Sequence, residues 1–144
     1  MTAVTAGAAV SDVGRVRASN QDSGYAGVRL FMVADGMGGH AGGDVASSIA
    51  VNRILQTDVQ PYTTPQEAEF ALQSALVSAN HLISETVLDH PELAGMGTTV
   101  SAMIRVDNAV AIAHIGDSRV YLFRDGELSQ ITNCLLYTSD AADE

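Results

Sequence analysis

The 144-residue sequence contains no lysine, a single cysteine and no long apolar run. The lone Cys134 can form no disulfide within the chain, as expected of a protein in a reducing cytoplasm. The N-terminal residues have no basic region and only a short apolar stretch, unlike a secretion signal. Crossing a bilayer takes about 20 consecutive apolar residues, which no segment approaches. We therefore expect a cytoplasmic chain without a membrane segment, so that any anchor would lie beyond its C-terminal end.

Positive charge is also scarce. The sequence has 7 basic residues, all of them arginine, against 17 acidic ones, for a net charge of −10. This balance argues against a nucleic-acid surface and suits either divalent-cation binding or solubility alone. A hydrophobic content of 47% can fill one core in a chain of this length. The expected organisation is a flexible N-terminus over residues 1–10 and one folded unit over residues 11–132.

The first half of the chain predicts two strands followed by two helices. Residues 30–34 form a short apolar run bounded by turn residues, typical of a buried strand, and residues 23–28 are a candidate antiparallel partner. Apolar residues then recur at helical spacing over residues 44–58. A second helix is predicted from Thr64 as N-cap, with Pro65 at the first helical position and Glu67 closing a capping box; His90-Pro91 ends it.

The second half predicts strands over residues 98–106, 109–115, 119–124 and 127–131, separated by turn residues. This pattern indicates an antiparallel meander. Asp125-Gly126 is its strongest hairpin signal, because both central residues of a type I′ turn need positive φ. Strands, two consecutive helices and then more strands indicate an α+β layered domain rather than a βαβ repeat.

The first candidate site is the glycine-rich segment VADGMGGHAGG at residues 33–43. A carboxylate at the end of the predicted strand can point from a rigid element into a cleft, and glycines permit positive φ and close approach of the main chain to an ion. Asp35 and the carbonyl of Gly36 are therefore candidate ligands for a hard cation. An ordinary turn aspartate is the alternative for Asp35.

Two further segments carry related chemistry: RASNQD at residues 17–22 and GDSR at residues 116–119. With DGMGGH at residues 35–40 and GTT at residues 97–99, they resemble, in order and spacing, the metal-dependent serine/threonine phosphatases of the PP2C (PPM) family in its bacterial form. The resemblance covers roughly residues 11–132. It implies a PP2C-like α-β-β-α sandwich, in which two antiparallel sheets pack face to face between helices, here truncated to the N-terminal half or somewhat more.

The resemblance also implies hydrolysis of phosphoserine and phosphothreonine on proteins. In such a site two Mg²⁺ or Mn²⁺ ions share a carboxylate, hold a bridging hydroxide and neutralise phosphate charge, so that no protein nucleophile is needed. Asp35 would bridge the two ions and Gly36 would give a carbonyl to one of them. Asp22 would bind through water or hold the ligands in place, and Asp117 would contribute to a third, weaker site. Arg17 would grip the substrate phosphate with its planar fork of donors.

These residues have ordinary interpretations as well. Arg17 alone is most often a solvated arginine, and Asp22 or Asp117 could simply complete a turn. Gln21 stands where the family has an acidic residue, which removes one water-mediated ligand. His40 is a candidate proton donor to the leaving group because of its pKa range, but it follows two further glycines and could instead contact substrate or cap the next helix.

The family's remaining metal ligands, aspartates in later D-G and D-N motifs, are missing from the sequence; Asp107-Asn108 is a predicted hairpin turn. Residues 133–144 continue neither a strand nor a helix and resemble the translation of a sequencing adapter, so we expect a non-native tail. The preferred hypothesis is a nearly inactive N-terminal fragment of a protein phosphatase that opposes serine/threonine kinases. The alternatives are a non-catalytic regulatory module of the same fold and a small acidic cation-binding protein complete in 144 residues.

Overall fold

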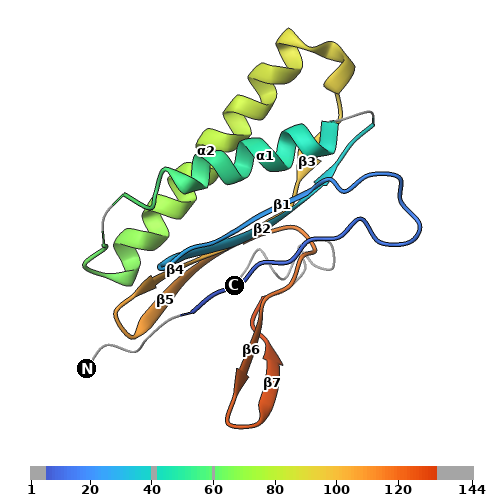
Figure 1. Ribbon diagram of the computed structural model, residues 1–144. Coiled ribbons are helices and arrows are strands. Elements are labelled where there is room, and N and C mark those ends of the chain that lie inside the picture. Colours follow the sequence, from blue (N-terminus) through green and yellow to red (C-terminus); the bar gives the residue numbers. More distant parts are fainter. Residues whose placement is uncertain (1–5, 40–41, 60, 133–144) are drawn as a thin grey trace.

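The computed structural model describes residues 6–39, 42–59 and 61–132. His40, Cys134 and the predicted tail at residues 133–144 lie outside these ranges, as does the first part of the predicted flexible N-terminus. In the described part, two helices cover one face of an antiparallel sheet with strand order β1-β2-β4-β5, in which the short strand β3 also pairs with β2 (Figure 1). A separate hairpin, β6-β7, forms a second sheet. The elements are β1 (Asp22–Ala26), β2 (Leu30–Met37), α1 (Gly42–Leu55), α2 (Pro65–Asp89), the short 3₁₀ helix η1 (Pro91–Leu93), β3 (Gly97–Thr98), β4 (Val100–Val106), β5 (Ala109–Ile115), β6 (Tyr121–Arg124) and β7 (Glu127–Gln130).

Strand β2 is longer than its apolar run predicts. It continues through Asp35 to Met37, because Asp22 of β1 pairs with Asp35 on one side and β3 pairs with Gly36 and Met37 on the other. Successive side chains alternate between the two faces of a strand, and Leu30, Met32 and Ala34 belong to the core beneath the helices. Asp35 therefore lies within a paired strand, not after its end, and its side chain is on the face away from the helices.

Helix α2 confirms its predicted start. The hydroxyl of Thr64 accepts a hydrogen bond from the N–H of Glu67 (3.2 Å), and Pro65 occupies the first turn. The return bond differs from a regular capping box, because the Glu67 carboxylate accepts from the N–H of Thr63 (3.3 Å), one residue earlier than expected. Helix α1 begins two residues before the predicted start and ends at Leu55, after which the chain to residue 59 continues as turns.

The predicted meander holds for two hairpins but is wrong between them. Strand β4 pairs with β5 and β6 pairs with β7, and positive φ at Asp125 (54°) and Gly126 (79°) fits the predicted tight turn. Residues 116–120 do not continue the ladder, and Gly116 at φ 100° turns the chain away from β5. As a result the β6-β7 hairpin projects from the side of the sheet opposite the helices (Figure 1).

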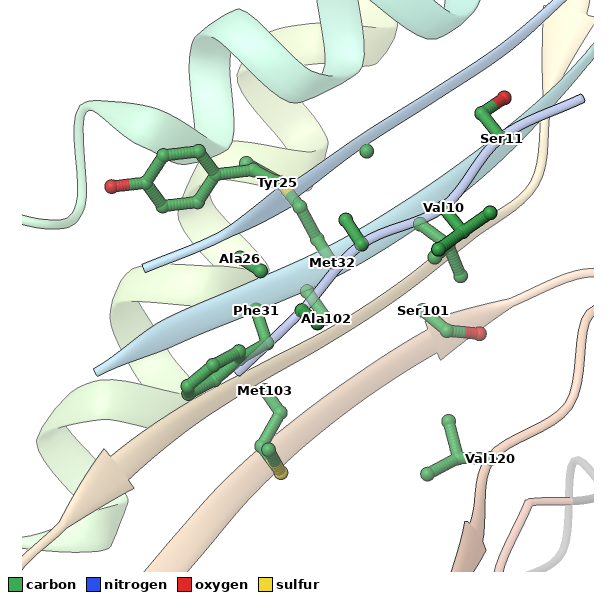
Figure 2. Close-up of a pocket in the computed structure, with 14 residues that line it drawn as sticks. Val10, Ser11, Tyr25, Ala26, Phe31, Met32, Ser101, Ala102, Met103 and Val120 are labelled. Atoms are coloured by element: carbon green, nitrogen blue, oxygen red, sulfur yellow. The ribbon is translucent and has the colours of Figure 1, made fainter. Parts of the chain in front are cut away.

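The core lies between the sheet and the helices; its largest fully buried apolar side chains are Leu30, Ile54, Leu72 and Ile104. The opposite face of the sheet is more open. Val33 is 52% exposed there, and a groove of about 390 Å³ is lined by residues that include Val10, Phe31, Met103 and Val120 (Figure 2). The α+β class is thus confirmed, whereas packing of a full second sheet over this face stays a prediction. Within the described ranges, no helix has the length and apolar character needed to span a membrane.

Candidate metal and phosphate site

Two aspartates from adjacent strands form the centre of the site. Asp22 is the register partner of Asp35 across β1 and β2, so both side chains point to the same face of the sheet. The charge of Asp22 acts on the neighbouring carboxyl group and raises the pKa of Asp35.

The surroundings of Asp35 disfavour its negative charge. Although the residue is open to solvent overall, partial desolvation is the largest cause that raises its pKa, followed by the neighbouring Asp22 and by the charge of Asp117. The guanidinium of Arg17 acts in the opposite direction and lowers the pKa of Asp35. The four residues that the sequence singled out on three separate segments therefore interact in the folded chain.

A polar cavity of about 190 Å³ contains the aspartate pair. Asp22 and Asp35 line it together with the segment that precedes β1, from which Arg17, Ser19 and Asn20 contribute. Asn20 holds this segment in place, because its side chain accepts from the N–H of Asp22 (3.0 Å) and donates to the hydroxyl of Ser11 (2.6 Å). The cavity thus combines three carboxylates, those of Asp12, Asp22 and Asp35, with one guanidinium, which suits a cation and an anion bound side by side.

Gly36 lies where strand β2 touches the start of helix α1. A Cβ at this position would come within 1.9 Å of the Gly43 carbonyl oxygen and 2.7 Å of the Gln21 carbonyl oxygen. The Gly36 N–H donates to that Gln21 carbonyl (3.2 Å). The glycine is therefore required for close approach of the main chain rather than for positive φ, which in this segment is found at Gly38 (144°).

Ser47 of helix α1 stabilises the same contact between the helix and the strands. It is fully buried in α1, and its hydroxyl lies 2.7 Å from the carbonyl oxygen of Gln21, to which it donates, and 3.0 Å from the hydroxyl of Ser23. These bonds hold the main chain before Asp22 and the side chain of the residue after it. Ser47 is not among the residues predicted from the sequence, although a serine next to Ala46 on the apolar face of a predicted helix is a usable signal.

Thr99 holds the main chain of Asp35 in place through hydrogen bonds. The N–H of Asp35 donates to the hydroxyl of Thr99 (3.1 Å), and the N–H of Thr99 donates to the carbonyl of Asp35 (2.9 Å). The Thr99 hydroxyl is also 2.8 Å from the hydroxyl of Ser118, next to Asp117. The GTT segment at residues 97–99, predicted through the resemblance alone, thus connects the segment that contains Asp35 with the segment that contains Asp117.

The set of potential ligands is incomplete in this part of the chain. Among the described residues, no three acidic, histidine or cysteine side chains gather closely enough to hold a metal ion by themselves. Asp117 is exposed on the loop after β5 and acts on Asp35 through its charge. His40, the candidate proton donor, lies outside the described residues.

The model of the protein phosphatase 2C family matches residues 14–134. The chain belongs to this family. It is 44% identical over 144 residues to the serine/threonine protein phosphatase PstP of Mycobacterium tuberculosis, covering 100% of this chain and 28% of the relative. It is 40% identical over 134 residues to the serine/threonine phosphatase stp of Listeria monocytogenes, covering 85% of this chain and 51% of that protein.

Solved structures of this PP2C family agree with the fold. A crystal structure of M. tuberculosis PstP/Ppp superimposes with a TM-score of 0.84 at 46% identity, over 88% of this chain and 53% of that one. The catalytic domain of PstP in complex with two manganese ions gives a TM-score of 0.82 at 48% identity, over 87% of this chain and 54% of the other. The chain therefore spans about half or less of the length of these PP2C relatives.

Proposed function

We propose that the protein containing this chain hydrolyses phosphoserine and phosphothreonine on other proteins with the help of divalent cations. The observation that carries the proposal is the pairing of Asp22 with Asp35 in a cavity that also contains Arg17. Two adjacent carboxylates are costly unless a proton or a cation lies between them. Oxygen ligands of this kind suit Mg²⁺ or Mn²⁺ better than a soft metal.

Each site residue has a role in this proposal. Asp35 would be the ligand shared by the two ions, and the carbonyl of Gly36 would bind one of them. Asp22 would bind through water or hold the ligands in place, and Asp117 would contribute to a third, weaker site. When bound, the ions activate water and neutralise charge on the transferring phosphoryl group. Arg17 binds the phosphate oxygens of the substrate, because its planar guanidinium matches two of them at once.

The known relatives support the choice of substrate and metal. PstP and stp are named serine/threonine phosphatases, and one PstP structure holds two manganese ions. Phosphoproteins made by serine/threonine kinases are accordingly the proposed substrates. Since the described part offers too few ligands for two ions, we further propose that the 144-residue chain alone is nearly inactive and that the remaining ligands come from the rest of the protein.

The test uses the complete protein, a phosphothreonine peptide and Mn²⁺. We expect release of phosphate that stops when EDTA is added and returns with excess Mn²⁺. The variant Asp35→Asn should lose nearly all activity, whereas Asp107→Asn, the same change at the exposed β4-β5 turn, should keep it. Full turnover in EDTA or in Asp35→Asn would refute the mechanism. Mn²⁺ binding without any turnover would favour a regulatory module that keeps the cation site.

A further inference from the structure

Thr99 contacts both Asp35 and the loop that carries Asp117. It lies between β3 and β4, is 4% exposed, and forms two main-chain hydrogen bonds to Asp35, one through its N–H and one through its hydroxyl. Together these bonds hold the peptide groups on either side of the Asp35 Cα. Any rotation of that residue would break at least one of them.

The same side chain supports the loop that carries Asp117. The hydroxyl of Thr99 is within 2.8 Å of the Ser118 hydroxyl, and either oxygen can be the donor. Because the Thr99 oxygen accepts from Asp35, its own proton is available for Ser118. On the other side of Asp117, a Cβ on Gly116 would lie 2.6 Å from the Thr99 methyl carbon, so the loop packs directly against this threonine.

We propose that Thr99 is a positioning residue that sets the orientation of Asp35 and couples it, through Ser118, to the loop bearing Asp117. The proposal rests on the proposed function in one respect, namely that these two aspartates serve divalent cations. A residue that fixes the ligands of a metal commonly changes metal affinity about 10-fold or more when it is lost. The coupling itself is a property of the fold and can be measured without turnover.

Substitutions at Thr99 separate its hydroxyl from its shape. In the complete protein, Thr99→Val keeps the branched side chain but removes the hydroxyl, whereas Thr99→Ser keeps the hydroxyl and removes the methyl group. Thr98→Val is the matched control, because the Thr98 hydroxyl donates to the adjacent Thr99 carbonyl (2.8 Å) and the residue lies in the same short segment. Ser118→Ala removes the link to the loop and leaves the Thr99–Asp35 bonds in place.

Two measurements decide the proposal: the dissociation constant for Mn²⁺ by calorimetry, and amide hydrogen exchange at Asp35 and at residues 116–119. For Thr99→Val we expect affinity to weaken about 10-fold and exchange to accelerate at both places. In Thr99→Ser and Thr98→Val, both the Mn²⁺ affinity and the amide exchange rates should stay close to those of the parent protein. For Ser118→Ala, exchange should accelerate at residues 116–119 and affinity should weaken by a smaller factor.

Some results would overturn the assignment. Thr99→Val with reduced thermal stability but parental Mn²⁺ affinity and exchange would make Thr99 a purely structural residue. Equal losses in Thr99→Ser and Thr99→Val would assign the effect to methyl packing. If Thr99→Val does not fold, parental behaviour of Ser118→Ala refutes the coupling. A parent protein that hydrolyses no phosphopeptide would refute the proposed function, while the exchange comparison would still decide the role of Thr99.

Discussion

Asp22 and Asp35 occupy directly opposed positions on β1 and β2, and the negative charge of Asp22 raises the pKa of Asp35. Like charges placed opposite each other on neighbouring strands destabilise a sheet. The fold therefore maintains an unfavourable pair on its surface, and a bound cation would relieve it. Stability and metal binding are expected to change in opposite directions when one of the two charges is removed.

The first prediction concerns Asp35→Asn. Without divalent cations, the loss of one negative charge should raise the free energy of unfolding slightly, by about 0.5 kcal/mol. With Mn²⁺ present, the variant should gain much less stability than the parent protein, because a ligand that binds the folded state stabilises it by mass action. Thermal unfolding in EDTA and in Mn²⁺ measures both effects. Asp107→Asn should change neither, and an undiminished Mn²⁺ shift in Asp35→Asn would contradict the assignment.

The second prediction is a pH dependence. Because the pKa of Asp35 is raised in the folded protein, this group contributes most to stability below its unfolded pKa and loses that contribution as the pH rises through the folded pKa. The metal-free protein should therefore lose stability relative to Asp35→Asn as the pH increases through that range. Urea unfolding of both proteins in EDTA, from acid to neutral pH, gives the difference. A difference that stays constant with pH would contradict the raised pKa.

The third prediction tests the contact between β2 and α1. In Gly36→Ala the new methyl group would clash with the Gly43 carbonyl oxygen, a main-chain atom that cannot move without shifting the helix. We expect a loss of about 3 kcal/mol in the free energy of unfolding, at the upper end for overpacking. Gly39→Ala is the control, since a Cβ there would have open space. Similar urea midpoints for the two variants would refute the close contact.

The elements of this fold could largely be predicted because their signals are local. The helix from Pro65 follows from the Thr64 cap and the spacing of its apolar residues, and the β6-β7 turn follows from Asp125-Gly126. The length of β2 could not be predicted in this way. Its last residues are polar or glycine and are held in a strand by partners at Asp22 and β3, which a local pattern does not reveal.

The candidate site likewise combines residues that could be predicted from the sequence with residues that could not. Arg17, Asp22, Asp35 and Asp117 could be selected by residue type and by resemblance, and the folded chain brings their charges together. Thr99 and Ser47, which hold these residues in place, could not be selected from the sequence, because their hydrogen bonds join distant parts of the chain. The Thr99 hydroxyl reaches an amide 64 positions earlier in the chain. Thr99 therefore looked like an ordinary β-branched strand residue until the sheet was assembled.

The last prediction concerns Arg17, which lines the polar cavity with the two carboxylates. If it binds the substrate phosphate, Arg17→Ala should raise KM for a phosphopeptide about 10-fold, the cost of one charge-assisted hydrogen bond. Mn²⁺ affinity should not fall, since the change removes a positive charge beside the cation site.

Further variants separate geometry from charge at this position. Arg17→Lys keeps the charge without the planar fork and should recover only part of the loss in KM. Arg15→Ala, at a nearby exposed arginine, is the control and should leave both constants unchanged. Phosphopeptide kinetics at saturating Mn²⁺, together with calorimetry, distinguish these effects. A fall in Mn²⁺ affinity without a change in KM would place Arg17 in the support of the metal ligands, because a phosphate-binding arginine acts on substrate and not on the cation.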